Sequence, residues 1–289
     1  MINVENRMLF AIPKKGRLYE QCAQYLKRIG LSFRKRDRHD IALCANMDIA
    51  IVFLPAKDIA LYVGSGKVDL AITGLDIVEE SGLSDEIDVK LPLGFGKCSL
   101  SLAVPKVSGL ALKDFENKRV VTSFPNLTKR FFEDAGLKNV QVSYVSGSVE
   151  IACALGAAEG ITDLVQTGDT IKEAGLVVIE EIFKTQAALI AKKDSTHKDL
   201  IEKLYARIQG IVYADDYALM EYNVKRENLN KCVKLTPGLK SPTIMPLDDN
   251  NWVAVKSVVK RKESNELADK LKSEGAFDIL ITVMENYRM

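Results

Sequence analysis

The sequence predicts an α/β protein made of two similar lobes, followed by a smaller α+β module. Short β-rich runs alternate with helical patterns along most of the chain, which is typical of α/β architecture. One phrase occurs twice, as DLAITGLDIVEESGL from Asp69 and as DLVQTGDTIKEAGL from Asp163. From about Tyr213 onward, the pattern changes to a βαββαβ-like order. The repeat indicates that the second lobe rebuilds the first.

The first lobe is expected to extend to about residue 90 and to contain a largely parallel sheet. Apolar runs predict strands at 9–12, 41–44, 48–54 and 69–73. The patterns between them predict helices at 18–30, 56–66 and 76–82. A glycine in the C-cap position, Gly82, closes the last of these helices.

The second lobe is expected to repeat this alternation. Strands are predicted within 97–105, 114–124, 141–147 and 161–165, and helices at 128–137 and 148–160. After 182–193, a helix at 197–212 is expected. Two such lobes imply a cleft, because ligands of open α/β sheets bind beyond the carboxyl ends of the strands. Both Thr-Gly turns would lie at such ends.

The last segment suits a small ferredoxin-like module. Its expected elements are a strand at 218–224, a helix at 226–235, a Pro-containing loop at 236–247, a strand at 251–259, a helix at 265–276 and a strand at 277–284. This fold hosts many functions, so by itself it does not name one.

Composition places the chain among globular proteins with full cores. It has 289 residues, of which 47% are apolar, enough for two or three ordinary domains. Lys and Arg number 40 and Asp and Glu number 39, so no global field would recruit nucleic acid or a membrane. We therefore expect neither as a partner, and any polyanion site must be local.

The cysteines are expected to be buried thiols in a reducing compartment. There are 5 of them, widely spaced and mostly within apolar runs. No pair has metal-ligand spacing, and with only 2 histidines no structural zinc site is expected. The N-terminus lacks a basic region followed by a long apolar one, and no stretch approaches the roughly 20 apolar residues of a membrane span. The expected location is the cytoplasm.

The two Thr-Gly turns are candidate anion sites. Each joins an apolar run to a helical stretch, so backbone N–H groups are free at a helix N-terminus, where the dipole favours anions. The second copy, Thr167-Gly168-Asp169-Thr170, adds hydroxyls and suits a phosphate. An ordinary capped βα turn is the alternative reading of either copy taken alone.

Six blocks follow one another along the chain. They are PKKGRL, DIALYVGSGKVDLAITGLD, LGFGKCSLSLAVP, TSFPNLTKR, GSVEIACALGAAEGITDLVQTGDT and TPGLKSPTIMPL. In this order they resemble the ATP phosphoribosyltransferase family in its long form, which catalyses the first step of histidine biosynthesis. The most specific block is the one from Gly147 to Thr170.

The resemblance implies two periplasmic-binding-protein-like (type II) lobes with a catalytic cleft and a C-terminal ferredoxin-like regulatory domain. Lobe I would cover residues 1–95, completed by about 190–212, and lobe II would cover 96–189 with the phosphate loop. The regulatory domain would cover 213–289. A homo-oligomer, from dimer to hexamer, is also implied.

The implied reaction joins N1 of ATP to the anomeric carbon of phosphoribosyl pyrophosphate with inversion, releases pyrophosphate and requires Mg2+. Charge develops on the leaving pyrophosphate and on an oxocarbenium-like ribose. The site therefore needs oriented donors, cations and metal, and no covalent nucleophile. The sequence agrees, because it has no Gly-x-Ser-x-Gly elbow and only 2 histidines.

The resemblance assigns substrate and catalytic roles residue by residue. Phosphoribosyl pyrophosphate is expected at Asp163, Thr167, Gly168, Asp169 and Thr170, with the loop around its 5′-phosphate. The candidate catalytic residues are Lys14, Arg17, Glu150 and Asp163.

These catalytic assignments leave alternatives open. Lys14 and Arg17 would meet pyrophosphate or an ATP phosphate, or they are solvated loop charges. Glu150 and Asp163 would bind ribose hydroxyls or magnesium, although Glu150 could instead complement a helix dipole. The charge of Asp169 is unhelpful in a phosphate loop unless its side chain points outward or meets magnesium.

ATP is expected to contact residues from both lobes, which are Arg17, Thr73, Asp76, Ser123 and Lys129. Asp76 would meet the adenine amino group or a metal-bound water, and a helix cap is the alternative. Lys129 or its neighbour Arg130 would close over substrate, or both are simple surface charges.

In the long-form family, the end product histidine binds the C-terminal domain and inhibits. Carried over by position, the pocket would contain Asn223, Leu239, Ser241, Thr243 and Val258. Some relatives carry an acidic residue at the place of Asn223, and Asn cannot stabilise an imidazolium cation, so affinity and its pH dependence are open. A turn before a strand is the alternative for Ser241 and Thr243.

Two other classes of protein compete with the enzyme. A two-lobed small-molecule binding protein shares the architecture, but it would carry a secretory signal and would not need the phosphate loop. A catalytically silent regulatory subunit could keep the fold. Here the phosphate loop and the histidine module lie on one chain, which favours a self-sufficient enzyme.

Overall fold

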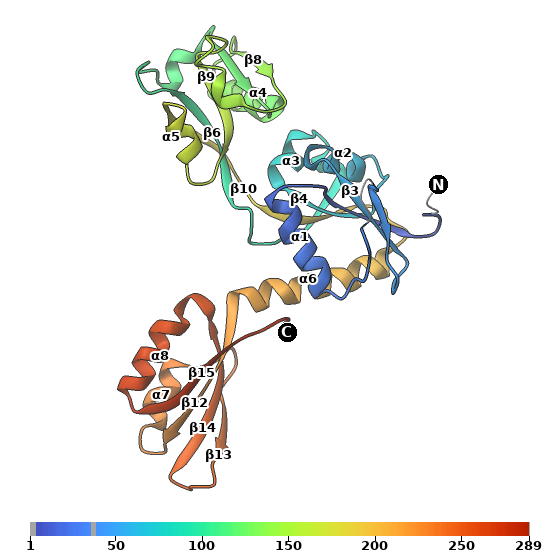
Figure 1. Cartoon of the computed structure of the whole chain (residues 1–289). Helices are drawn as coiled ribbons and strands as arrows, with labels where there is room; N and C mark the ends of the chain where they lie inside the picture. The colour runs from blue at the N-terminus through green and yellow to red at the C-terminus, as the bar shows by residue number, and fades with distance from the viewer. Residues whose placement is uncertain (1–3, 36–38, 289) are drawn as a thin grey trace. The chain divides into compact units, whose positions relative to one another are not determined.

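The computed structural model of the chain describes residues 4–35 and 39–288 (Figure 1). The chain divides into two compact units. The first comprises Met1–Gln24 and Leu31–Glu202, and the second comprises Tyr25–Gly30 and Lys203–Met289. The first unit holds two sheets, and the second holds one.

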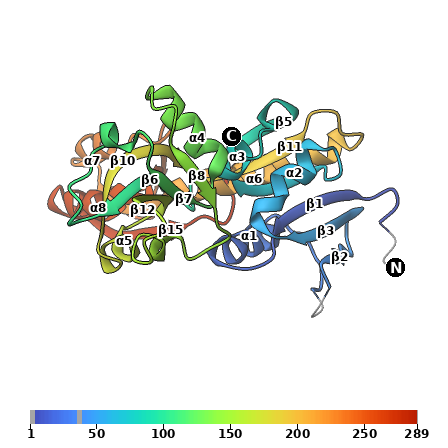
Figure 2. The same ribbon diagram turned by 90° about the horizontal axis from the view of Figure 1, so that it is seen from above.

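The first sheet has the strand order β2-β3-β1-β4-β11-β5. Its strands are β1 (Met8–Pro13), β2 (Ile41–Leu43), β3 (Ile49–Leu54), β4 (Leu70–Gly74), β5 (Ile87–Pro92) and β11 (Ala187–Lys192). β3, β1 and β4 run parallel, with Phe10 opposite both Ile51 and Leu70. Figure 2 shows β1 and β3 side by side. These three strands are almost wholly buried, as expected where both faces of a sheet are covered.

The helices of this sheet follow its strands closely in the chain. They are α1 (Arg17–Arg28), α2 (Ala56–Gly64), α3 (Leu75–Glu80) and the short 3-10 helix η1 (Ser84–Glu86). Helix α2 buries Ile59, Ala60 and Val63 in one cluster with Ala71 and Ile190. The spacing of these apolar residues gives α2 a single buried face, so it packs on the sheet.

The second sheet has the strand order β10-β6-β9-β7-β8. Its strands are β6 (Cys98–Pro105), β7 (Arg119–Thr122), β8 (Gln141–Tyr144), β9 (Gly160–Val165) and β10 (Leu176–Thr185). Its helices are α4 (Pro125–Asp134), α5 (Asp169–Glu173) and the 3-10 helices η2 (Leu112–Phe115) and η3 (Val149–Ile151). Leu102, Val104, Phe115, Val120 and Phe132 form one of its core clusters, in which two phenylalanine rings stack 5.6 Å apart.

The expectation of a largely parallel first sheet is only partly correct. β11 is antiparallel to both β4 and β5, and β6 is antiparallel to both β9 and β10. β6 and β11 are the strands that follow the two passages of the chain between the sheets. Such a strand joins its sheet without a helical crossover. It therefore runs antiparallel to neighbouring strands that are connected to one another through helices.

The helix expected at 148–160 is wrong. The segment forms only η3, followed by turns up to residue 156. Ser148 has φ 50° and Gly156 has φ 68°, both in the left-handed region. Between them, the N–H groups of Ala152 and Gly156 donate to the oxygens of Val149 and Cys153, three residues back, which is the bonding of a 3-10 turn and not of an α-helix.

The sheet of the second unit has the strand order β13-β14-β12-β15. Its strands are β12 (Tyr217–Lys225), β13 (Thr243–Pro246), β14 (Trp252–Lys260) and β15 (Ala276–Val283). Its helices are α6 (Lys198–Asp216), which begins in the first unit, α7 (Leu229–Leu235), the 3-10 helix η4 (Arg261–Glu263) and α8 (Ser264–Ser273).

The expected ferredoxin-like fold is confirmed in this unit. Burial alternates strictly along β12 and β14, so one face of the sheet points into a core. Met220, Tyr222, Val253 and Val255 form this core with residues of α7 and α8, which cover that face (Figure 1). The sequence pattern did not separate β13 from its Pro-containing loop, because all four of its residues are exposed.

Two further properties concern the whole described chain. The cysteines are free thiols, and Cys22, Cys44 and Cys232 are buried. Within residues 4–35 and 39–288, no helix has the length and apolar character needed to cross a membrane.

Candidate active site

The first Thr-Gly turn, Thr73-Gly74, has no open loop between its strand and its helix. β4 ends at Gly74 and α3 begins at the next residue, so there is no loop between them. Thr73 is wholly buried, and its hydroxyl has no hydrogen-bond partner within the described residues. Gly74 has φ −74°, an ordinary extended conformation. This turn exposes no hydroxyl for a ligand.

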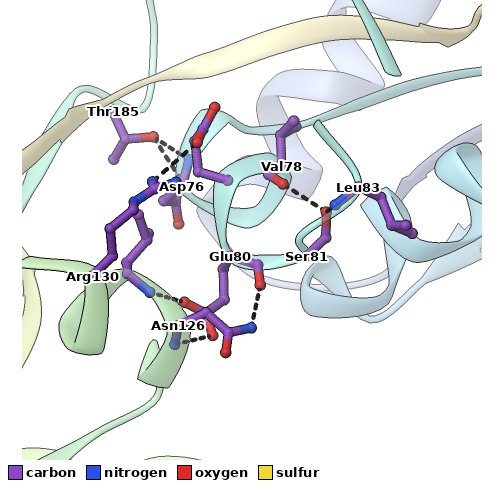
Figure 3. A network of polar contacts seen from close by, with 10 residues as sticks. Asp76, Val78, Glu80, Ser81, Leu83, Asn126, Arg130 and Thr185 are labelled. Carbon is purple, nitrogen blue, oxygen red and sulfur yellow. Dashed lines mark hydrogen bonds and ion pairs between the residues drawn. The ribbon is translucent and has the colours of Figure 1, made fainter. Parts of the chain in front are cut away.

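Asp76 fills the space beside this turn. Its Oδ1 accepts a hydrogen bond from Thr185 Oγ1 at 2.6 Å, and its N–H donates to the same hydroxyl oxygen at 3.0 Å (Figure 3). A Cβ added at Gly74 would collide with this carboxylate, so only glycine fits there. Burial raises the pKa of Asp76, while hydrogen bonds from Thr185 and two backbone N–H groups oppose the rise.

The second Thr-Gly turn is open and exposed. β9 ends at Val165, and a loop at 166–168 precedes α5. Gly168 has φ 82°, which glycine adopts without strain. In the described part of the chain, the backbone N–H groups of Gly168, Asp169 and Thr170 have no hydrogen-bond partner. The two copies of one phrase therefore fold differently, and only the second leaves donors for an anion.

The carboxylate of Asp169 has a hydrogen-bond partner within this loop. Its Oδ2 accepts a hydrogen bond from Thr167 Oγ1 at 2.7 Å. Both side chains are exposed, and so is Thr170. The carboxylate thus orients the Thr167 hydroxyl at the edge of the loop.

Asp163 and Glu150 form a pair of like charges. Asp163 lies on β9 two residues before its end, and its Oδ1 accepts the N–H of Leu164 at 2.8 Å. Burial raises the pKa of Asp163 and the charge of Glu150 raises it further, although the Leu164 N–H opposes both. The described residues contain no group of three or more His, Cys, Asp or Glu able to hold a metal ion. A cation here would rest on this pair, on water and on substrate oxygens.

A cavity of about 360 Å³ lies between the two sheets of the first unit. Its polar lining comes from residues beside the two chain passages and the phosphate loop, which include Lys97, Ser99, Gln166, Lys184, Thr185 and Gln186. Burial, together with the charges of Asp76 and Asp163, raises the pKa of Cys98 in this wall to about 11. The thiol is therefore neutral at pH 7.

Lys97 and Lys184 are site residues that the sequence reasoning missed. Both line the cavity, and Lys184 pairs with Glu181 at 3.2 Å. The signal was present, because both lysines flank the passages of the chain between lobes in LGFGKC and FKTQ.

The basic loop after β1 meets the loop at 166–168 through one contact. Arg17 Nη1 donates to Gln166 Oε1 at 3.0 Å, which joins the start of α1 to the loop after β9. Lys14 is exposed immediately after β1, and its backbone N–H donates to Leu54 O at 2.8 Å. The structure therefore brings Arg17, but not Lys14, into contact with the loop.

The predicted basic edge of the second lobe lies at helix α4. Ser123 Oγ donates to Val145 O at 2.7 Å, so this hydroxyl already has an acceptor. Lys129 is exposed on α4. Neither residue lines the cavity.

The predicted regulatory residues largely meet around a second cavity of about 580 Å³ in the second unit. Four of them line it, namely Leu239, Ser241, Thr243 and Val258. Asn223 is not among the lining residues, and its Nδ2 donates to Asp278 Oδ2 at 3.0 Å. The cavity is also lined by Lys240, Lys256, Tyr287 and Arg288, which the sequence reasoning did not identify.

Comparison with known families gives two matches along the chain. The family model described as ATP phosphoribosyltransferase matches residues 55–210, and that described as HisG, C-terminal domain, matches residues 214–286. The ATP phosphoribosyltransferase of Yarrowia lipolytica is 42% identical over 293 residues, which cover 99% of this chain and 98% of that protein. That of Saccharomyces cerevisiae is 41% identical over 295 residues with the same coverage.

Solved structures agree with the fold. A chain of the ATP phosphoribosyl transferase (HisG:HisZ) complex from Thermotoga maritima is similar with a TM-score of 0.64 at 28% identity, covering 72% of this chain and 98% of that chain. A substrate binding protein of an amino acid ABC transporter is similar with a TM-score of 0.50 at 12% identity, covering 72% and 94%. The second likeness concerns the fold alone, and it confirms the expected binding-protein-like lobes.

Proposed function

The chain belongs to the ATP phosphoribosyltransferase family, and on this premise we propose that it joins N1 of ATP to the anomeric carbon of phosphoribosyl pyrophosphate. As a member of this family it is a glycosyltransferase of the pentosyl class, as expected from the sequence. The proposed products are phosphoribosyl-ATP and pyrophosphate, and the proposed place of the reaction is the first step of histidine biosynthesis. We further propose a homo-oligomer in the cytoplasm, as the resemblance implies.

The open loop after β9 is the observation that carries the proposal. Its three free backbone N–H groups and the hydroxyl of Thr170 are donors for the three oxygens of a 5′-phosphate. The first Thr-Gly turn offers no such donors, because Thr73 is buried and Asp76 occupies the adjacent space. Phosphoribosyl pyrophosphate is therefore assigned to the lobe that carries β9.

The ribose and the leaving group would extend from this loop toward the cavity. Asp163 lies on the same strand and is proposed to accept hydrogen bonds from ribose hydroxyls. Arg17, already at the loop edge, and Lys14 are proposed to take up charge on the leaving pyrophosphate. Attack by N1 then needs orientation and charge stabilisation, and no covalent intermediate.

Residues of both lobes are proposed to hold ATP. Arg17 and Lys129 are exposed cations for its phosphates, and Ser123 stands at the start of α4. Thr73 and Asp76 are buried, so they are proposed to act on ATP indirectly, by supporting residues that line the cavity. Asp76 would do so by fixing Thr185, which lines the cavity.

Magnesium is the proposed cofactor, and the residues present fit it. The charge of Glu150 raises the pKa of Asp163, a repulsion that a bound cation would relieve, and oxygen atoms are the ligands that magnesium prefers. Glu150 and Asp163 would hold the ion together with substrate oxygens. The bound ion would supply positive charge that offsets the charge of pyrophosphate.

Histidine is the proposed inhibitor, and the cavity of the second unit is its proposed site. Ser241 and Thr243 offer hydroxyls for its polar atoms, and Leu239 and Val258 offer apolar contact with the ring. Lys240, Lys256 and Arg288 bring positive charge for its carboxylate. Asn223 would contribute only after leaving its bond to Asp278.

The test is an ultraviolet assay of phosphoribosyl-ATP formation from ATP, phosphoribosyl pyrophosphate and magnesium. We expect turnover, its loss on chelation of magnesium, and its suppression by millimolar histidine. Turnover without suppression would keep the enzyme and remove the inhibitor site. A folded chain without turnover would contradict the proposed activity and favour the silent-subunit or binding-protein alternatives.

A further inference from the structure

Helix α4 lacks an N-cap of its own. Phe124 occupies the N-cap position and has no side-chain acceptor, and Pro125 follows at the first helical position. Proline has no N–H, so the first amides of the helix that need acceptors are those of Asn126 and Leu127. The sequence around α4 offers neither of them a capping side chain.

The missing acceptor comes from the other lobe. Glu80, the last residue of α3, accepts the N–H of Asn126 on Oε1 at 2.9 Å and the N–H of Leu127 on Oε2 at 2.9 Å. Asn126 Nδ2 donates in return to the backbone oxygen of Glu80 at 2.8 Å. Figure 3 shows this reciprocal contact.

Charge reinforces the contact. The N-terminus of α4 carries the positive end of the helix dipole, and Lys129 and Arg130 add positive charge near the Glu80 carboxylate. Arg130 also pairs with Glu79 at 3.1 Å. This second pair is half exposed on the Arg130 side, so it adds little by itself.

Helix α3 is thereby bonded to the second lobe at both of its ends. Its first turn meets β10 through Asp76 and Thr185, and its last residue meets α4 through Glu80. α3 itself follows β4 of the first sheet without a loop. A short rigid element fixed at both ends limits how the two lobes can rotate apart on this side of the cavity.

We propose that Glu80 is a positioning residue, which caps α4 across the cleft and holds the lobes at the closure that substrates need. The kinetic consequence rests on the proposed function, because substrates would be held by the loop of one lobe and by Arg17 of the other. Without the cap, a smaller fraction of the molecules is closed before binding. The apparent affinities for both substrates fall in proportion to that closed fraction. Saturating substrate still closes the lobes, so the chemical step is unchanged.

The first experiment is amide hydrogen exchange on the full chain with Glu80→Gln. The amide of glutamine keeps one acceptor oxygen and turns a donor toward the other N–H. We expect the amides of Asn126 and Leu127 to exchange at least about tenfold faster than in the wild type. Glu79→Gln is the matched control, and it leaves both amides protected. Equal exchange in the wild type and in Glu80→Gln overturns the proposal.

The second experiment separates binding from catalysis in the same variants. We expect Glu80→Gln to raise KM for both substrates about tenfold with kcat within about twofold, and Glu79→Gln to change neither. Asn126→Ala, which removes only the returned hydrogen bond, should raise both KM values about threefold. Unchanged or lower KM values in Glu80→Gln overturn the proposal.

Binding distinguishes failure of this inference from failure of the proposed activity. Calorimetric titration of phosphoribosyl pyrophosphate into the wild type and Glu80→Gln needs no turnover. Suppose that the wild type shows no turnover but binds phosphoribosyl pyrophosphate with a Kd about tenfold lower than that of Glu80→Gln. This result contradicts the proposed activity and supports the cap. Equal Kd values overturn the cap, whether or not the wild type turns over.

Discussion

At the scale of single residues, Asp69 shows how a buried carboxylate stabilises this fold. Its Oδ2 accepts the N–H of Leu9 at 2.9 Å, and its Oδ1 meets Ser195 Oγ at 2.8 Å and Lys192 Nζ at 2.9 Å. Three chain segments far apart in sequence thus meet at one carboxylate, which begins the first copy of the repeated phrase. A helix or strand pattern contains no signal for such a junction.

Asp69→Asn is expected to lower the free energy of unfolding by about 3 kcal/mol, because Lys192 would lose its buried partner. Burial raises the pKa of Asp69, but the three donors outweigh it and hold the pKa below the usual 3.8. The stabilisation is therefore complete above pH 3.8 and is lost as pH falls through the lower folded value.

Urea unfolding across the acidic range measures both effects. The wild type should lose its advantage over Asp69→Asn only below the usual carboxyl pKa. Glu266→Gln is the control, since Glu266 pairs with Lys270 on an exposed helix face. This substitution should leave the free energy of unfolding nearly unchanged. A constant difference at every pH would contradict the assignment to this carboxylate.

At the scale of elements, the packing of α4 on β9 helps to place the proposed phosphate loop. Thr128 of α4 and Thr162 of β9 are fully buried, and their hydroxyls are 2.6 Å apart. Thr162 immediately precedes Asp163 on the strand that leads into the loop. The same helix that is capped from the first lobe is therefore bonded to the strand that carries the site.

Thr128→Val is expected to destabilise the fold by about 2 kcal/mol, because the Thr162 hydroxyl is left buried without its partner. The double variant Thr128→Val/Thr162→Val should cost less than the sum of the two single changes, since both polar groups are then gone. Thermal or urea unfolding of the four proteins in the cycle measures the coupling. Strictly additive losses would contradict a direct hydroxyl pair.

Elements with strong periodicity could be predicted from the sequence, and the directions of strands could not. The apolar runs of β1, β3 and β4 and the helical pattern of α2 identify these elements without ambiguity. The antiparallel insertion of β6 and β11 follows from where the chain passes between lobes, which periodicity does not encode. The short strand β13 has no buried face to produce an alternating pattern.

The part of the candidate site that could be predicted from the sequence is the loop whose shape depends on the backbone of Gly168. Gly168 and the two threonines beside it mark the anion loop in the sequence, and the structure gives Gly168 its positive φ. The identical Thr73-Gly74 pair was given the same meaning, yet Asp76 folds over it. Glu80 could not be found from sequence, because its partners on α4 are 46 and 47 residues away.

At the scale of the whole molecule, the proposed inhibitor site and the proposed active site lie in different compact units. A change confined to the second cavity should alter inhibition and leave catalysis intact. Ser241→Ala is expected to raise the histidine concentration for half-inhibition about tenfold, the loss of roughly one good hydrogen bond, with kcat unchanged.

Inhibition curves for the two proteins measure this change. Ser273→Ala is the control, because its hydroxyl donates to Lys270 O on α8 and lies outside the cavity. Equal half-inhibition in Ser241→Ala and the wild type would contradict the assignment of this cavity to histidine. A parallel fall in kcat would contradict the separation of the two sites.

The most direct test of the central claim is a crystal structure of the full chain with phosphoribosyl pyrophosphate and magnesium. We expect the 5′-phosphate within hydrogen-bond distance of the backbone N–H groups of Gly168, Asp169 and Thr170, with the ribose against Asp163. We expect the pyrophosphate on the side of Arg17. A 5′-phosphate bound at the Thr73-Gly74 turn, or away from both turns, would contradict the account.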